Sequence, residues 1–246
     1  MDERFAVIAD IHGNADALRA VLADIEAQGA PPILNLGDIA SGPLAPAEVM
    51  EIVMATPMRS LRGNHDRVLV EANPADMGTT DAVTHAALTA EQLNWLAALP
   101  FSLEIGDIFA CHATPRDDET YWMERVTPEG NVVQRPLGEI AAEAEGLAAS
   151  LYLCGHSHLA RAVRLPDGAL LVNPGSVGCP AYDDIAPVPH QVEAGCPHAR
   201  YAIVTRTTTG WAATHRALPY DTTRMAAAAR AYGREDWARA VSTGWL

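Results

Sequence analysis

Short apolar runs and helically spaced apolar residues alternate through the first quarter of the chain. The run "RFAVIAD" predicts a strand, and behind it the apolar residues of 18–25 follow the i, i+3, i+4, i+7 spacing of one buried helix face. Asn14 suits the N-cap of that helix and Gly29 its end. Next, "PILNLGD" predicts a strand, "PAEVMEIVMA" a helix and "MRSLRGNHD" a strand running into a loop. This order predicts a parallel sheet with crossover helices.

The pattern changes to hairpins further along the chain. A Thr-x-x-Gln capping box at 89–92 precedes an apolar helix face, and two strands follow that meet at the turn 106–107. An alanine-rich helix is expected from about 137 to 149, a second hairpin turns at 167–168, and a third spans 199–218. Alternating strands and helices in the first half and successive hairpins in the second half predict an α/β fold with two mixed β-sheets packed between helices.

Length and composition favour a single domain over residues 1–246. The chain has 246 residues, of which 49% are hydrophobic, enough to bury a sizeable core. The segment 179–199 contains four prolines and is predicted to be a long loop, and the tail 221–246 is predicted to be helical. A homo-oligomer stays open at this stage.

Charge and cysteine content limit the location and the partners. The formal net charge of -14 argues against extended nucleic-acid binding, which requires clustered Lys and Arg. The N-terminal stretch lacks the pattern of a signal peptide, and no apolar run reaches the roughly 20 residues of a membrane span. Four cysteines without CxxC spacing suit reduced thiols. We therefore expect a cytoplasmic protein that does not enter a membrane.

Polar residues with metal-ligating groups follow nearly every predicted strand. They are Asp10, His12, Asp38, Asn64, His65, Asp66, His112, His156 and His158. In open α/β sheets, ligands bind outside the carboxyl ends of the strands, so these side chains are expected to converge. Taken singly, several also fit simpler roles: a helix cap at Asp10, a turn at Asp38, an ordinary polar strand end at His112.

The complete set of motifs resembles the calcineurin-like metallophosphoesterase superfamily, in its small bacterial phosphodiesterase and phosphatase branch. The resemblance rests on Asp-x-His at 10–12, Gly-Asp at 37–38, Gly-Asn-His-Asp at 63–66, His112 and Gly-His-Ser-His at 155–158, in this order. It covers residues 5–178 and includes "NPGSVG" at 173–178. It implies a four-layer sandwich of two mixed sheets flanked by helices.

The resemblance also implies two divalent metal ions bridged by Asp38. One ion would take Asp10, His12 and His158 as further ligands, and the other Asn64, His112 and His156. His65 matches the catalytic histidine of the family, and Asp66 matches an acidic neighbour that orients it. His112 is followed by Ala113 where many relatives have glycine.

The residue types suit hydrolysis of a phosphate ester. Imidazole, carboxylate and amide ligands together favour Mn, Fe, Zn, Ni or Co over calcium. Two such ions can generate a metal-bound hydroxide and clamp the oxygens of an in-line displacement. The expected substrate is a small phosphomonoester or phosphodiester. Alternatives are a nucleotide or dinucleoside polyphosphate hydrolase, and a protein-binding scaffold, which the complete ligand set disfavours.

Several residues outside the motifs leave two roles open. Arg116 is placed either on a substrate phosphate or in a surface salt bridge. The segment 121–123, Tyr-Trp-Met, either lines a pocket or belongs to the core. His190 is expected on the surface or in a loop, and Trp237 is expected to pack on the body or on another subunit.

Overall fold

The computed structural model describes residues 3–246, and its first sheet carries the N-terminal strand in the centre. The strand order is β14-β13-β1-β2-β3, from strands β1 (Arg4–Ile8), β2 (Ile33–Asn35), β3 (Met58–Ser60), β13 (Ala199–Thr207) and β14 (Gly210–Leu218). β1 runs parallel to β2 and β2 parallel to β3, while β13 is antiparallel to β1 and to β14. The predicted parallel unit and the hairpin at 199–218 are confirmed.

The second sheet contains the other two predicted hairpins. Its order is β4-β5-β8-β10-β9, from strands β4 (Ser102–Ile105), β5 (Ile108–Cys111), β8 (Leu151–Leu153), β9 (Arg161–Arg164) and β10 (Leu170–Asn173). The pairs β4–β5 and β9–β10 are antiparallel, whereas β5, β8 and β10 run parallel. Both sheets are therefore mixed.

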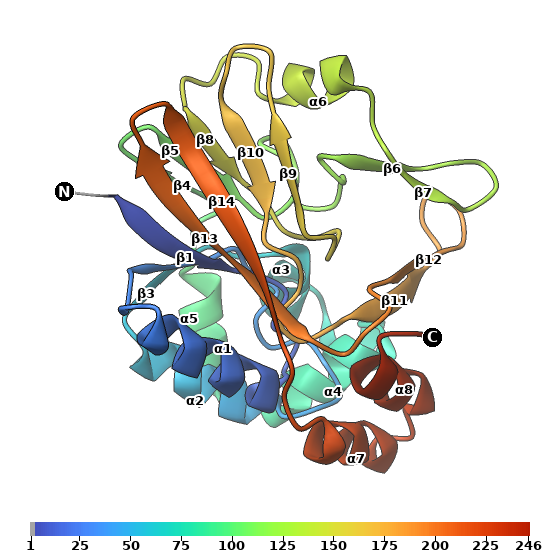
Figure 1. Ribbon diagram of the computed structural model, residues 1–246. Coiled ribbons are helices and arrows are strands. Elements are labelled where there is room, and N and C mark those ends of the chain that lie inside the picture. Colours follow the sequence, from blue (N-terminus) through green and yellow to red (C-terminus); the bar gives the residue numbers. More distant parts are fainter. Residues whose placement is uncertain (1–2) are drawn as a thin grey trace.

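The two sheets face each other and helices cover their outer sides, which confirms the predicted sandwich (Figure 1). Buried residues of both sheets form the middle of the core, among them Val7 and Leu34 of the first and Leu153 and Val172 of the second. The outer face of the first sheet packs against helix α1 (Ala15–Ala27) and helix α2 (Pro46–Ala55). Helix α6 (Leu137–Glu143) packs on the outer face of the second.

Helix boundaries follow local capping groups. The Asn14 side chain accepts a hydrogen bond from the Ala17 amide, so the predicted N-cap of α1 is confirmed. The capping box at 89–92 begins helix α5 (Ala90–Ala97), also as predicted. Helix α3 (Asn64–Glu71), the short 3₁₀ helix η1 (Pro74–Asp76) and helix α4 (Thr79–Ala87) precede it.

Three predicted elements were wrong in extent. The stretch 64–66 is the first turn of α3 rather than a loop, because the Asp66 carboxylate accepts the Gly63 amide and caps the helix. Helix α6 ends at Glu143, well before residue 149, ahead of Gly146 with its φ of +89°. The expected loop 179–199 contains a hairpin of β11 (Ala181–Asp184) and β12 (His190–Glu193).

Two projecting hairpins and the helical tail surround one side of the sandwich. The hairpin of β6 (Glu124–Val126) and β7 (Val132–Gln134) and the β11–β12 hairpin extend from it, and helices α7 (Thr223–Ala231) and α8 (Glu235–Thr243) lie below β11 in the view of Figure 1. The predicted helical tail is confirmed. Within residues 3–246, every helix is too short or too polar to cross a membrane.

Candidate metal centre

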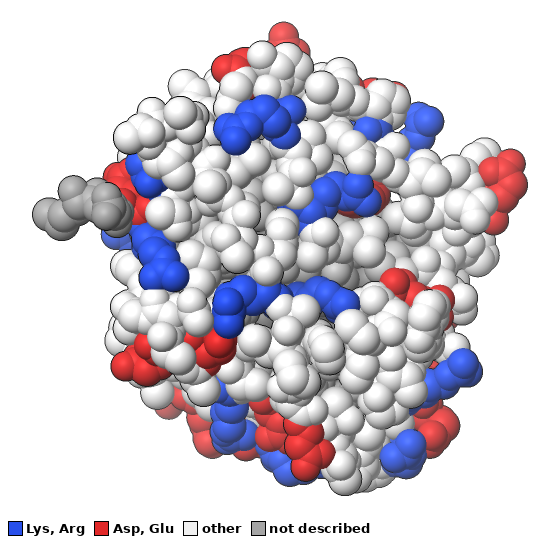
Figure 2. Space-filling model, in the orientation of Figure 1, with Lys and Arg blue, Asp and Glu red and all other residues white. Residues whose placement is uncertain are grey.

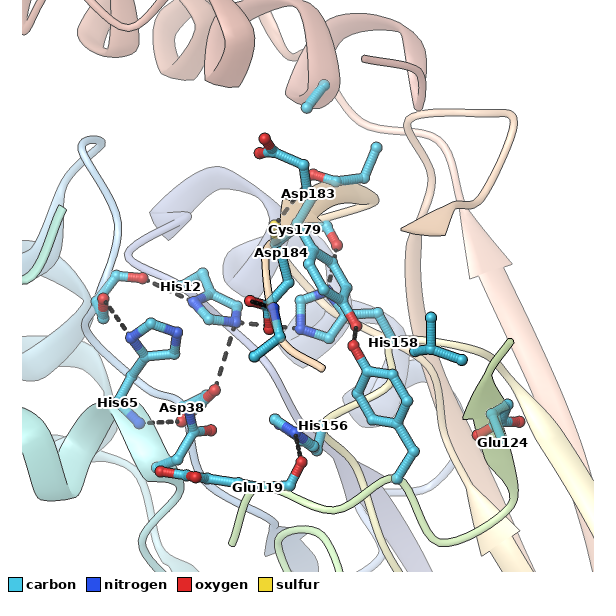
Figure 3. A pocket seen from close by; sticks show the side chains of 18 of the residues that line it. His12, Asp38, His65, Glu119, Glu124, His156, His158, Cys179, Asp183 and Asp184 are labelled. Carbon is cyan, nitrogen blue, oxygen red and sulfur yellow. Dashed lines mark hydrogen bonds and ion pairs between the residues drawn. The ribbon is translucent and has the colours of Figure 1, made fainter. Parts of the chain in front are cut away.

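The carboxyl ends of strands from both sheets meet at one place. Asp10 follows β1, Asp38 follows β2, His112 follows β5, and His156 follows β8. In Figure 3, side chains from the segments after β1, β2 and β8 point toward one another in a pocket of 910 Å³; those labelled are His12, Asp38, His156 and His158. The expected convergence at the strand ends therefore occurs, and it joins residues more than a hundred positions apart.

The converging side chains form two clusters of ligand atoms. Asp10, His12 and His158 make up one, and Asp38, His112 and His156 the other, with the ligand atoms of each cluster within 4.8 Å of one another. This division agrees with the ligand sets that the resemblance implied.

Two further contacts connect the clusters and extend one of them. Asp38 Oδ2 lies 3.6 Å from His12 Nε2 and 3.4 Å from His112 Nε2, so this carboxylate faces both clusters. Asn64 Oδ1 lies 3.1 Å from His112 Nε2 and adds an amide oxygen to the second cluster.

The backbone at these positions is held in an uncommon conformation. Six non-glycine residues in the described chain have positive φ, and five of them are expected ligands: Asp10, His12, Asp38, His156 and His158. A left-handed conformation in a non-glycine residue costs free energy, and such residues concentrate at functional sites. Tight turns after the strands thus aim the ligand side chains at the centre.

Backbone carbonyls fix which ring nitrogen each histidine presents. The Nδ1 atoms of His12, His112 and His158 each donate to a backbone carbonyl oxygen at 2.7 Å, those of Ser41, Leu36 and Cys179. Their Nε2 atoms are therefore the ones that face the clusters. His156 is reversed: its Nε2 donates to the Glu119 carbonyl at 2.6 Å, which leaves Nδ1 for the cluster.

The environment of the clusters suits cations. Asp10 Oδ2 is buried without a hydrogen-bond partner among the described residues, in a place where an ionised oxygen needs a positive neighbour. Burial lowers the pKa of His12 to about 4, and burial together with the nearby His112 lowers that of His156 to about 4. Neutral imidazole and carboxylate oxygen are the donors that divalent transition metals take, so these residues fit such ions.

His65 lies beside the clusters but is oriented by a residue other than the expected one. Its Nδ1 donates to Asp81 Oδ1 at 2.9 Å, and Ser41 Oγ donates to the same oxygen at 2.5 Å. Asp66 instead accepts the backbone amides of 38, 39 and 63, so the expectation that Asp66 orients His65 was wrong. The carboxylate of Asp66 holds the Asp38 loop against the start of α3.

Asp81 could not be found from the strand-end pattern because it lies in helix α4, far from any strand end. It is 8% exposed, and Thr84 in the same helix bonds to the Gly42 amide, which docks α4 on the loop that follows Asp38. Burial opposes ionisation of Asp81, but the hydrogen bond and charge of His65 outweigh it and lower the pKa of Asp81.

Arg116 points away from the site. Its guanidinium contacts Glu143 at 3.4 Å and the Ala142 carbonyl on α6, and 58% of its side chain is exposed. The surface salt bridge, one of the two roles left open for Arg116, is the observed one, and the phosphate contact stays a prediction. Loop 112–121 turns this side chain toward α6 rather than toward the pocket.

Aromatic residues from distant segments complete the pocket wall. Tyr121 and Tyr182 line it, while Trp122 and Met123 are buried in the core, so the segment 121–123 divides between its two proposed roles. Trp237 of α8 also lines the pocket, with its ring 6.1 Å from that of His12, and thus does more than pack on the body.

His190 lies inside rather than on the surface. Its side chain is buried, and its Nε2 is 3.0 Å from the Tyr121 hydroxyl. The surface prediction for His190 failed because it assumed an unstructured loop, whereas β12 places this residue inside.

The "NPGSVG" element, residues 173–178, is hydrogen-bonded to the Asp10 loop. The amides of Val177 and Gly178 donate to the carbonyls of Ala9 and Asp10. A Cβ atom on Gly178 would lie 1.8 Å from the Ile11 carbonyl oxygen, so only glycine fits this approach. The prediction that glycines here let the backbone pass close to the site is confirmed.

Comparisons with known proteins agree with this geometry. The family model of the calcineurin-like phosphoesterase superfamily domain matches residues 4–188. An uncharacterised protein of Methanocaldococcus jannaschii is 30% identical over 199 residues, which cover 71% of this chain and 76% of that protein.

Solved structures share the fold. A metallophosphoesterase from Sphaerobacter thermophilus is 26% identical with a TM-score of 0.76, covering 99% of this chain and 100% of that one. A hypothetical protein from Pyrococcus horikoshii OT3 is 19% identical, also with a TM-score of 0.76, covering 98% of both chains.

Proposed function

Because the chain belongs to the calcineurin-like phosphoesterase superfamily, we propose that it is a hydrolase with two metal ions that cleaves a small phosphomonoester or phosphodiester. The observation that carries this proposal is the pair of ligand clusters with Asp38 facing both. A pair of divalent ions needs such a shared carboxylate, since one oxygen donor between two cations reduces their repulsion.

The chain's own residues would hold the two ions. Asp10, His12 and His158 would bind one; Asp38, Asn64, His112 and His156 would bind the other, with Asp38 also facing the first. When bound, divalent ions lower the pKa of water and neutralise charge on phosphate oxygens. The ions also supply the positive charge that a chain with a net charge of -14 needs to attract a phosphate.

His65 would donate a proton to the leaving oxygen. Its Nδ1 is bonded to Asp81, so Nε2 is the nitrogen that remains for the substrate, and the residue lines the pocket. Burial lowers the pKa of His65, but the charges of Asp38 and Asp81 outweigh burial and raise it to about 9. A protonated imidazole held in one orientation is suited to general acid catalysis.

The further expectations remain proposals. The donor set favours Mn, Fe, Zn, Ni or Co as the metal. We propose that the protein is cytoplasmic, because its four cysteines are all free thiols. Figure 2 shows arginines in small separate groups on one face, with acidic side chains between several of them, which favours a small substrate over a nucleic acid.

Hydrolysis of p-nitrophenyl phosphate and bis(p-nitrophenyl) phosphate in the presence of Mn tests the proposal. We expect His65→Ala to lower the rate about 100-fold or more, in line with the value of a general acid, and Asp38→Ala to abolish it. Unchanged rates in both variants would overturn the proposal, and no hydrolysis of either ester by the wild-type protein would favour the alternative of a protein-binding scaffold.

A further inference from the structure

Resting on the proposed phosphoesterase function, we propose that the pocket beside the Asp10–His12–His158 cluster binds an alkylammonium group, so that the preferred substrate is a phosphate ester with a cationic amine substituent. The subsite is formed by Trp237, Tyr182, Asp183 and Asp184, which all line the same pocket as His12 and His158.

Four aromatic rings follow one another along this side of the pocket. The Trp237 ring lies 6.1 Å from that of His12, His12 lies 5.0 Å from His158, and His158 lies 4.6 Å from Tyr182. Trp237 comes from α8 and Tyr182 from β11, so two separate elements each place an aromatic ring beside a histidine of this cluster. Aromatic faces attract ammonium groups through the ring quadrupole.

Hydrogen bonds occupy the hydroxyls of both tyrosines in this part of the pocket. His190 Nδ1 donates to the Val188 carbonyl, so its Nε2 accepts from the Tyr121 hydroxyl at 3.0 Å. Tyr121 has then used its proton, and the Tyr182 hydroxyl donates to it at 2.6 Å. This chain of hydrogen bonds fixes the ring of Tyr182 against His158.

Among residues 3–246, every arginine that lines the pocket is paired, which leaves no free guanidinium for a second anionic group. All 17 basic residues of the chain are arginine. Those that line the pocket are each paired with carboxylates: Arg125 with Glu139, Arg135 with Glu139 and Glu143, and Arg234 with Asp236. The guanidinium of Arg234 also lies 5.9 Å from the centre of the Trp237 ring, so one face of this ring already meets a cation.

Carboxylates face the space beyond the metal cluster instead. Asp183 and Asp184 are exposed on β11, and in Figure 3 they lie above His12 and His158. Asp184 Oδ1 accepts the amides of Ile185 and Ala186, which holds the side chain in place. Both aspartates lack a cationic partner among the described residues. Negative charge in the same pocket as aromatic rings favours a cation and repels the further phosphates of a dinucleoside polyphosphate.

A matched pair of substrates tests the subsite. p-Nitrophenyl phosphorylcholine and p-nitrophenyl 3,3-dimethylbutyl phosphate have the same shape and leaving group, and differ in whether the terminal group is trimethylammonium or tert-butyl. We expect kcat/KM to be about tenfold higher for the choline ester, as for a desolvated cation–π contact. Trp237→Leu, Tyr182→Leu and the double variant Asp183→Asn with Asp184→Asn should each reduce this ratio, whereas Glu91→Gln on distant α5 should keep it.

A binding measurement keeps the result separate from catalysis. Calorimetry on the metal-loaded protein should show choline binding about tenfold more tightly than 3,3-dimethylbutanol. Equal kcat/KM for both esters and equal binding would overturn the ammonium subsite while leaving the phosphoesterase function standing. Tight choline binding without hydrolysis of any ester would support the subsite and overturn the phosphoesterase function. Faster cleavage of a dinucleoside polyphosphate than of the choline ester would also overturn the subsite.

Discussion

The Nε2 atoms of His12 and His158 face each other at 3.2 Å, although the Nδ1 atom of each ring already donates to a backbone carbonyl. In neutral rings both Nε2 atoms then carry lone pairs, and two lone pairs at this separation repel each other. Burial holds the pKa of both rings down, which disfavours a proton between them. A divalent cation removes the repulsion, and the first prediction follows from this relationship.

His158→Ala is expected to reduce the metal content of the purified protein from about two divalent ions per chain to about one, since only Asp10, His12 and the shared Asp38 would remain to hold the first ion. Inductively coupled plasma mass spectrometry measures the content directly. His85→Ala on α4, outside both clusters, serves as the control and should keep the wild-type value. Two ions in the His158 variant would contradict the assignment of the first cluster.

Removal of metal is expected to lower the melting temperature. An ion that binds only the folded chain stabilises it by about 2.7 kcal/mol at 100 times its dissociation constant. Here the effect should be marked because Asp10 Oδ2 is otherwise buried without a partner among the described residues. Thermal unfolding with chelator, and again after Mn is added back, tests this; a melting temperature indifferent to metal would count against a buried ion at Asp10.

The sequence predicted the ligand clusters well because strand ends impose a simple geometry. Parallel strands carry Asp10 and Asp38 to one edge of the first sheet, and His112 and His156 to one edge of the second. Asp81 and Trp237 were beyond such reasoning, since each lies on a helix whose docking is decided by tertiary contacts. Proline content misled the prediction for 179–199, because four prolines still leave enough amides for a two-stranded ladder.

Gly178→Ala is expected to destabilise the protein by about 1–3 kcal/mol, the usual cost of forcing an atom into packed structure. The added Cβ would lie 1.8 Å from the Ile11 carbonyl oxygen and push the Asp10 loop from its place. Gly138→Ala is a matched control, since nothing lies within 4 Å of its Cβ position in α6, and it should stabilise by about 0.5–1 kcal/mol. Urea unfolding compares the two; equal stability would contradict the close approach.

Asp24→Asn is expected to lower the free energy of unfolding by about 1–3 kcal/mol at pH 7, as for hydrogen bonds to a charged group. Asp24 on α1 accepts from Arg216 Nε and from the Tyr201 hydroxyl, each at 2.5 Å, and its bonds to Arg216 lower its pKa. A lowered pKa in the folded state stabilises above the unfolded value of about 3.9 and is lost as pH falls through the folded value.

The difference between wild type and Asp24→Asn should therefore shrink below pH 4, while exposed Glu26→Gln on the same helix should show little difference at either pH. A difference that grows on acidification would contradict the ionised Asp24 contact.

The final prediction concerns Asp81 as the residue that positions His65. Asp81→Asn is expected to lower kcat about 10- to 100-fold, part of the 10²–10⁴-fold value of a general acid, with little change in KM or metal content. The carboxylate accepts the proton on Nδ1 at 2.9 Å and thereby keeps Nε2 toward the substrate. An asparagine amide in its place turns a donor toward His65 as readily as an oxygen, so the ring loses a fixed orientation.

The pH profile separates positioning from a structural role. Asp81 raises the pKa of His65, so the protonated imidazole persists to higher pH. Without that charge the pKa falls, and the alkaline limb of the kcat profile should move to lower pH. Asp81→Glu keeps the charge and should restore part of the rate, while Asp76→Asn in η1, also acidic but outside the pocket, should leave kcat and profile unchanged. A lower rate with an unmoved alkaline limb and no rescue by glutamate would reduce Asp81 to a residue that merely holds α4 in place.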